Sequence, residues 1–431
     1  MTEGLRTLRV GVSLGAIHDS SERFPSPNCH PETRKEVRQI ILDWILEESP
    51  ASSFFWLYGP AGAGKTALLQ AIAEFLCSPS GSGQKFGGSF FFSRGRQGHN
   101  QGHFLFSTIA YQLALNVPGL RQHVNHIMET NPTLHTKSMA VQLQSLIVDA
   151  FYHLSPLPQH SFLVIIDGLD ECHDTVTQQL ILRLLRETIT VHKLPLRFVI
   201  GSRPESHIRA SFDQESLRTI THRVVLDETF NPAKDIQVFL QDGFAKICAE
   251  SFFLSDVEQP WPSEGTIDLL VQRSSGQFIY AATVLKFVSA DYVNPKKQLT
   301  LVLNSDPTAF SDLDHLYTQI LSAYPSAVNI VQVLGIISAS HGELAEAIED
   351  IFGMEGGQLK AVLRGLLSLM TDENGKGSKK YVIPRFAHTS FSDYLNDLSR
   401  SGPFHVNRQE YENQIITRSF TLIVQSIRSL E

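Results

Sequence analysis

Residues 59–66, GPAGAGKT, have the types and spacing most specific for chemistry. Gly59, Gly64, Lys65 and Thr66 fill every fixed position of the pattern G-x-x-x-x-G-K-[ST]. In such a loop consecutive backbone N–H groups point at an anion, while the lysine and the hydroxyl reach the β- and γ-phosphates and Mg²⁺. The pattern predicts a nucleoside triphosphate site. Its expected binding residues are Gly59, Pro60, Ala61, Gly62, Ala63, Gly64, Lys65, Thr66 and Ala67.

The flanking sequence decides between this site and a chance match in an ordinary glycine loop. Residues 54–58, FFWLY, predict a buried strand before the loop. Residues 65–76 have the spacing of an amphipathic helix after it. A strand, a glycine loop and a helix are the context that the motif requires, so we interpret the segment as a P-loop.

A second group of candidate residues follows the apolar segment FLVII, residues 162–166. A carboxylate at the carboxyl end of a parallel strand lies beside the P-loop, so Asp167 is expected to hold Mg²⁺ together with Thr66. Asp170 or Glu171 would polarise the attacking water. The alternative is a solvated acidic turn or a helix N-cap.

Arg203 follows another predicted strand, residues 196–201. A guanidinium there can bind the γ-phosphate through two parallel hydrogen bonds; otherwise Arg203 is a surface charge. Strands at 89–93 and 221–226 complete the pattern. We predict an α/β fold, a P-loop NTPase parallel sheet with helices on both faces. The expected catalytic residues are Lys65, Asp167, Asp170, Glu171 and Arg203.

Composition bounds the class of protein. The 431 residues have a net charge of −8, 42% hydrophobic residues and only four cysteines, none in a C-x-x-C pair. These values indicate a folded chain without a disulfide framework or a zinc site. No apolar run approaches the roughly 18 residues of a membrane span. We therefore expect a cytoplasmic protein with neither a membrane nor a nucleic-acid partner.

The remaining chain predicts mainly helices. Residues 1–30, which include the Ser- and Pro-rich stretch SSERFPSPNCHP, are expected to form an arm without a core of its own, followed by a lead-in helix at 33–48. Three helical segments and a hairpin within 313–400 predict a winged helix, whose middle helix is too acidic for DNA. The last segment, 407–430, is helical, but nothing follows it in the sequence for it to pack on, so it is interpreted as the opening of a further helical region.

The expected domains follow from these patterns. They are an N-terminal arm and lead-in helix at 1–50, a nucleotide-binding P-loop domain at 51–228, a small helical domain at 229–305, a winged-helix domain at 306–402, and the start of a further helical segment at 403–431.

Several short motifs in this order resemble the NACHT-type NTPases of the STAND class, most closely fungal proteins with a nephrocystin-3-like N-terminal domain. The resemblance covers about residues 29–400. Its motifs are CHPETR (29–34), GPAGAGKT (59–66), SFFFSRG (89–95), IIDGLDE (165–171), GSRPE (201–205), SSGQFIYAAT (274–283) and FAHTSFSDYL (386–395).

The resemblance implies further site residues. His388 matches a winged-helix histidine that hydrogen-bonds the β-phosphate of bound ADP in that family. Thr33 and Arg34 match a segment near the adenine; alternatively, Thr33 and Glu36 form a capping box. In that family a small glycine follows the metal-binding aspartate, and the acidic pair comes after it; here the glycine is Gly168 and the pair is Asp170 and Glu171. The family's G-x-P proline is absent from residues 274–282, so no base contact is assigned there.

The resemblance implies an ATP/ADP switch. ADP would hold a closed monomer, ATP with Mg²⁺ would open it toward self-association, and slow hydrolysis would reset it in intracellular signalling. One alternative is a nucleotide-stabilised scaffold or decoy, since we identify neither an effector nor a repeat region in the sequence. Another is a turnover enzyme such as a small-molecule kinase.

Overall fold

The computed structural model divides the chain into two compact units, Met1–Phe230 and Asn231–Glu431. The five-part division expected from the sequence is finer and remains a prediction. The structure describes residues 2–23, 26–27, 29–47, 51–79, 85–94, 98–255, 257, 259–290, 294–304, 312–322, 330–339, 345–357, 359, 363, 366–370, 383–386 and 388–428.

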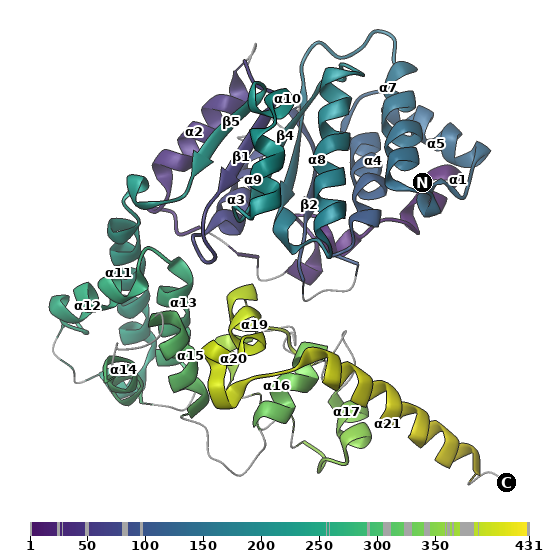
Figure 1. Cartoon of the computed structure of the whole chain (residues 1–431). Helices are drawn as coiled ribbons and strands as arrows, with labels where there is room; N and C mark the ends of the chain where they lie inside the picture. The colour runs from purple at the N-terminus through teal and green to yellow at the C-terminus, as the bar shows by residue number, and fades with distance from the viewer. Residues whose placement is uncertain are drawn as a thin grey trace. The chain divides into compact units, whose positions relative to one another are not determined.

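The first unit contains a five-stranded sheet in the order β2-β3-β4-β1-β5 (Figure 1). The strands are β1 (Phe54–Tyr58), β2 (Phe86–Phe91), β3 (Phe162–Asp167), β4 (Leu196–Ser202) and β5 (Thr221–Val225). Every pairing is parallel. All carboxyl ends therefore meet at one edge, where β4 separates the P-loop strand β1 from the strand that ends in Asp167.

Helices cover both faces of this sheet, as predicted. Phe54 and Trp56 of β1 pack into one core cluster, and the alternating Phe55 and Leu57 pack into the other. The second cluster includes α2 (Lys35–Leu46) and α3 (Lys65–Cys77). The first includes α4 (Leu105–Asn116), α5 (Leu120–Thr130), α8 (Thr175–Thr190), α9 (Ser206–Asp213), α10 (Glu215–Arg218) and the continuous run α6 (Met139–Gln142), a π-helical segment (Leu143–Val148) and α7 (Asp149–Tyr152).

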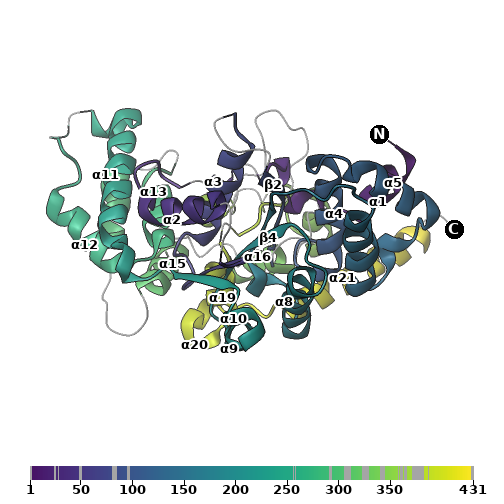
Figure 2. The same ribbon diagram turned by 90° about the horizontal axis from the view of Figure 1, so that it is seen from above.

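The N-terminal segment has no core of its own but packs onto the core of the first unit, a contact that the sequence did not indicate. A short helix, α1 (Glu3–Arg9), lies beside α4 and α5 in both views (Figures 1 and 2). Leu5 and Leu8 are fully buried in the first unit's core. An ideal Cβ on Gly4 would lie 2.2 Å from the Asn125 carbonyl oxygen, so α1 approaches α5 very closely.

Other sequence boundaries also differ. Strand β2 begins at Phe86 and ends at Phe91, earlier than the predicted 89–93. Its start was hidden because Gly87 and Gly88 are poor strand formers; here the absent side chains leave room for α4 residues. Helix α5 was not predicted. Within the described residues, no helix is long and apolar enough to cross a membrane.

The second unit is mostly helical and has its own hydrophobic core. Its helices are α11 (Pro232–Glu250), α12 (Glu264–Ser274), α13 (Phe278–Val288), α14 (Pro295–Leu303), α15 (Asp312–Ser322), α16 (Ile330–Ala339), α17 (Ala345–Phe352), α19 (Thr389–Asn396), α20 (Leu398–Ser401) and α21 (Arg408–Arg428). Met370 and Phe386 form an antiparallel bridge. This bridge fits the predicted hairpin, whose turn at 372–380 and much of the helix before it lie outside the described residues.

The last helix packs on helices that precede it in the chain. Helix α21 packs on α16 and α17. An ideal Cβ on Gly335 would lie 2.2 Å from the Tyr411 ring, and the Arg418 guanidinium lies 4.8 Å from the centre of the Phe352 ring. The surface on which α21 packs is therefore formed by two helices that precede it in the sequence.

Candidate functional site

The P-loop leaves β1 at Tyr58 and enters α3 at Lys65. Gly62 and Gly64 have φ values of +73° and +91°, a region that side chains with a Cβ rarely adopt. An ideal Cβ on Gly59 would lie 2.8 Å from the Leu226 carbonyl oxygen. The motif glycines are therefore required by the loop's turn and by its close approach to the end of β5.

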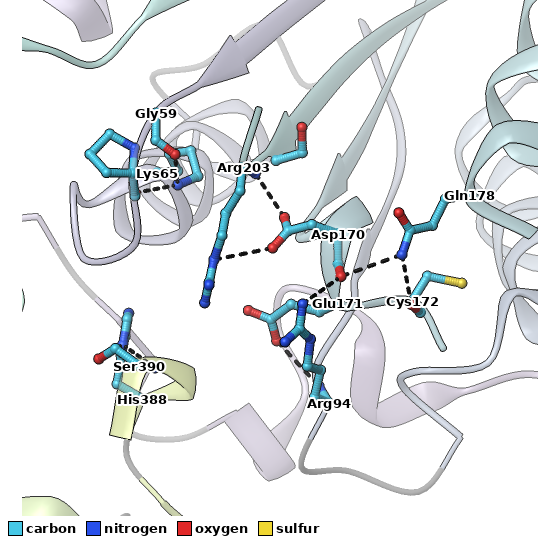
Figure 3. A network of polar contacts seen from close by, with 12 residues as sticks. Gly59, Lys65, Arg94, Asp170, Glu171, Cys172, Gln178, Arg203, His388 and Ser390 are labelled. Carbon is cyan, nitrogen blue, oxygen red and sulfur yellow. Dashed lines mark hydrogen bonds and ion pairs between the residues drawn. The ribbon is translucent and has the colours of Figure 1, made fainter. Parts of the chain in front are cut away.

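Lys65 folds back over this loop (Figure 3). Its Nζ donates to the carbonyl oxygens of Gly59 at 2.9 Å and Pro60 at 2.8 Å. Burial lowers the pKa of Lys65, whereas the nearby carboxylates of Asp170 and Asp167 oppose that shift. The ammonium thus lies in a loop whose geometry suits phosphate and in the field of two acidic groups.

Asp167 ends β3 and is 2% exposed. Burial raises its pKa, and a hydrogen bond from Thr66 opposes the rise. Among the described residues, no hydrogen-bond partner reaches Asp167 Oδ1. An ideal Cβ on Gly201 would lie 2.3 Å from that oxygen, so the glycine in the adjacent strand β4 leaves the space that the carboxylate occupies.

These oxygen donors fit Mg²⁺. Mg²⁺ in nucleotide sites is commonly held by one or two protein oxygens together with waters and phosphate oxygens. The Thr66 hydroxyl and the Asp167 carboxylate supply such oxygens from neighbouring elements. In the part of the chain that the structure describes, no group of three or more His, Cys, Asp or Glu residues could hold a metal ion alone. The donor set therefore suits a cation that arrives with a nucleotide.

Asp170 lies on a short 3₁₀ helix after β3, Leu169–Glu171, and binds the end of β4. Its Oδ1 accepts from the Arg203 backbone N–H at 2.9 Å, and Oδ2 lies 3.3 Å from Arg203 Nε (Figure 3). The side chains are 3% and 19% exposed, respectively. Arg203 is therefore a partly buried, paired cation and not a simple surface charge.

Glu171 has a different environment from Asp170. Its Oε2 accepts from the Arg94 backbone N–H at 3.2 Å, and the Arg94 guanidinium donates to the Asp170 carbonyl at 3.0 Å. Burial, followed by the neighbouring Asp170 charge, raises the pKa of Glu171 to about 7. Because Asp170 is engaged with Arg203, Glu171 is the acidic residue of this turn better suited to accept a proton near neutral pH.

The segment before α2 contacts the P-loop from outside the motif. Arg34, 4% exposed, donates from its guanidinium to the Ala63 carbonyl oxygen at 3.1 Å. Thr33 Oγ1 donates to the His30 carbonyl at 3.0 Å, and Arg34, not Thr33, is the N-cap residue. The capping box with Glu36 is therefore not formed. A contact of Thr33 or Arg34 with a nucleotide remains a prediction, as does that of Ala67.

His388 belongs to the second unit, where it caps α19. Its Nδ1 accepts from the Ser390 backbone N–H at 3.1 Å and lies 2.7 Å from Ser390 Oγ (Figure 3). The side chain is thus held by its own helix terminus. Its contact with a bound nucleotide remains a prediction.

Sequence reasoning missed Arg94 and Gln178. Gln178 Nε2 donates to the Cys172 carbonyl at 2.8 Å, and its Oε1 lies 2.5 Å from His207 Nε2, linking α8 with the acidic turn and α9. Arg94 follows β2, the neighbour of β3, so the rule that parallel strand ends converge could have identified it. Gln178 lies in a helix and carried no such signal.

A family model described as "Nephrocystin 3, N-terminal" matches residues 37–203. The match spans the P-loop, Asp167, the acidic turn and Arg203, and covers less than half of the chain. No curated protein matches the chain. With the sheet order and the loop geometry, this match supports a P-loop NTPase. The NACHT, STAND and fungal assignments remain predictions.

Three solved structures are similar at low identity. The Aeropyrum pernix ORC2 protein in ADPNP-ADP complexes has 13% identity and a TM-score of 0.38, with 95% of this chain and 100% of that chain covered. Aeropyrum pernix ORC1 in complex with DNA has 12% and 0.37, with 90% and 92% covered. Drosophila ORC bound to DNA has 14% and 0.37, with 88% and 97% covered.

The prediction that nucleic acid is not a partner is corrected. Two of these three proteins are bound to DNA, which contradicts that exclusion. The physical flaw is that a net charge of −8 describes the whole chain, whereas nucleic-acid binding depends on where basic residues gather. The exclusion of nucleic acid is therefore withdrawn, and no nucleic-acid partner is assigned to this chain.

Proposed function

We propose that the chain is a nucleotide-operated switch that binds ATP and ADP with Mg²⁺ and hydrolyses ATP slowly. The observation that carries this proposal is the convergence of Lys65, Asp167 and Arg203 at the ends of β1, β3 and β4. The three residues supply an ammonium, a carboxylate and a guanidinium to one sheet edge. That combination serves a triphosphate with a divalent cation.

The residues divide the chemistry between them. The loop N–H groups and Lys65 bind the β- and γ-phosphates, and Thr66 and Asp167 would hold Mg²⁺, which neutralises phosphate charge when bound. Glu171 orients a water and accepts its proton, because its raised pKa makes it a stronger base than an ordinary glutamate. Asp170 positions Arg203 through the paired contacts at β4.

The switch requires that the two nucleotides stabilise different conformations, since a ligand shifts an equilibrium only by its differential affinity. Arg203 would favour ATP, because only ATP has a γ-phosphate. His388 would favour ADP in a closed monomer by binding its β-phosphate. ATP would then open the chain toward self-association, and slow hydrolysis would reset it.

The first experiment compares bound nucleotide in the wild type and Lys65→Ala, each purified, heat-extracted and analysed by chromatography. We expect ADP in the wild type and none in the variant, because Lys65 neutralises phosphate charge. Circular dichroism of both proteins verifies that the variant is folded. A folded wild type that contains no nucleotide and fails to bind added ATP with Mg²⁺ contradicts the proposal.

A second measurement separates a switch from a nucleotide-stabilised scaffold. Light scattering after size exclusion is recorded for Glu171→Gln with ADP and with ATP plus Mg²⁺. A switch gives a larger particle with ATP, since hydrolysis is blocked. A scaffold binds both nucleotides and has the same mass with each.

A further inference from the structure

A chain of hydrogen bonds runs through the second unit from α15 to His388. The Tyr317 hydroxyl lies 2.8 Å from Ser390 Oγ, which lies 2.7 Å from His388 Nδ1. Tyr317 and Ser390 are 1% and 4% exposed. Figure 3 shows the final step, from Ser390 to His388. Buried hydroxyls need partners, so this chain is an ordered arrangement and not a solvated contact.

The donors in the chain fix which ring nitrogen carries hydrogen. The Ser390 backbone N–H can only donate, and it points at His388 Nδ1 at 3.1 Å. Nδ1 must therefore be an acceptor, and in the neutral ring the hydrogen belongs to Nε2. The Ser390 hydroxyl can donate to the same Nδ1 while it accepts from Tyr317. Burial raises the pKa of Tyr317, so its hydroxyl keeps the proton that it donates.

The surrounding contacts hold this geometry. The Tyr317 ring centre lies 4.8 Å from that of Phe391 and 5.4 Å from that of Tyr394, both on α19. The Tyr394 hydroxyl lies 2.8 Å from Thr318 Oγ1 on α15. These contacts join α15 to α19, so the hydroxyl of Tyr317 cannot drift from Ser390 without displacing packed aromatic rings.

Arg400 adds a charged connection to the same helix. Its Nε and Nη2 donate to the two carboxylate oxygens of Asp314 at 2.9 and 2.7 Å. Paired hydrogen bonds between a guanidinium and a carboxylate fix both orientation and distance. Helix α15 is therefore fixed both to α19 and to the segment after it, which preorganises the histidine.

We propose that Tyr317 and Ser390 are positioning residues that hold His388 as the Nε2–H tautomer, a neutral hydrogen-bond donor for a phosphate oxygen of a nucleoside diphosphate. This inference rests on the proposed function. Hydrogen bonds from a neutral donor to a charged acceptor are stronger than neutral ones. The strength with which the chain retains ADP is then set by α15 as well as by His388.

The first readout needs no nucleotide. Histidine ¹⁵N chemical shifts are measured in the nucleotide-stripped full chain, with the His388 signals assigned by their loss in His388→Ala. We expect an unprotonated Nδ1 and a protonated Nε2 in the wild type. Ser390→Ala and Tyr317→Phe keep the backbone N–H of residue 390 and remove only the hydroxyl contact to Nδ1 or its support, so in them the two shifts should move part of the way toward each other. Ser392→Ala, a serine on the same helix outside the chain, is the matched control. A wild-type ring protonated at Nδ1 overturns the inference.

The second readout is the dissociation rate of a fluorescent ADP. Ser390→Ala and Tyr317→Phe should release it roughly 5- to 10-fold faster, the scale of one weakened hydrogen bond, and Ser392→Ala should not. If His388→Ala releases ADP faster while neither chain variant does, the inference fails and the proposed function stands. If His388→Ala leaves the rate unchanged, the ADP-holding role of His388 fails, and the inference with it.

Discussion

Asp170 binds Arg203 through both of its carboxylate oxygens, one to the backbone N–H at 2.9 Å and the other facing Nε at 3.3 Å. The contact ties the acidic turn after β3 to the end of the neighbouring strand β4. Because Arg203 Nε faces Asp170 and the guanidinium is planar, this contact also fixes the orientation of the two terminal nitrogens. If Arg203 binds a γ-phosphate, as proposed, a movement of Arg203 would be transmitted through Asp170 to the turn that carries Glu171.

Arg203→Ala should weaken ATP binding more than ADP binding. A charge-assisted hydrogen bond contributes about 1.5–3 kcal/mol, so we expect a loss of roughly 10- to 100-fold for ATP with Mg²⁺. Calorimetric titration with both nucleotides measures the difference. Arg209→Ala, on the exposed side of α9, is the control. Equal losses for ATP and ADP would show that Arg203 stabilises the site without sensing the γ-phosphate.

Glu171→Gln should reduce ATP hydrolysis by roughly 100-fold or more while nucleotide binding persists, the scale of a lost general base. In the wild type the carboxylate must be ionised to act. Since the pKa of Glu171 is raised to about 7, the rate should rise as pH increases through 7 and level off above it. The measurement is single-turnover hydrolysis from pH 5.5 to 8.5. A rate that is flat across this range removes Glu171 from the role.

Arg94→Ala should move that pH profile. The variant keeps the backbone N–H that Glu171 accepts but loses a cation whose charge lowers the pKa of Glu171. The midpoint should therefore shift to higher pH, and the rate at pH 7 should fall while ATP affinity changes little. Arg94→Lys retains the charge and should shift the midpoint less. If both variants keep the wild-type midpoint, the Arg94 charge does not act on Glu171.

The motif and strand pattern predicted the P-loop fold of the first unit, because its signals are local in sequence, whereas the roles of the site residues remain predictions. The loop at 59–66 and the strand ending in Asp167 each contain their own evidence. What could not be predicted are pairings between segments. Asp170 with Arg203, and Arg94 with Glu171, depend on the order of strands in the sheet, which no single segment encodes.

The same reason explains why the packing of the two ends of the described chain could not be predicted. The sequence did not predict α1, because the helix has only two large apolar residues, Leu5 and Leu8. The helix on which it packs, α5, lies more than a hundred residues away in the sequence. Helix α21 packs on α16 and α17, which precede it. A tertiary partner outside the local window decided both cases, and helical periodicity alone carries no information about it.

Gly201→Ala should disrupt the proposed metal site without touching the P-loop. The added Cβ would lie 2.3 Å from Asp167 Oδ1 and 2.7 Å from Leu69 Cδ1, so the carboxylate has to move. We expect Mg²⁺ to lose its effect on ATP affinity, measured by titrating ATP with Mg²⁺ and with EDTA. Gly265→Ala, where no atom lies within 4 Å of the new Cβ, is the control. A wild-type response to Mg²⁺ in Gly201→Ala would argue against Asp167 as a ligand.

Leu8→Ala tests whether the first helix belongs to the core. Leu8 is fully buried, whereas Val10, just after the helix, is 75% exposed. Truncation of a buried leucine costs about 2–5 kcal/mol, and truncation of an exposed side chain usually changes stability by less than about 0.5 kcal/mol. Urea unfolding followed by tryptophan fluorescence in a Trp261→Phe background, where Trp44 and Trp56 of the first unit are the remaining reporters, measures both variants. A helix that did not pack on the first unit would make Leu8→Ala as harmless as Val10→Ala, whereas a packed helix makes only Leu8→Ala destabilising.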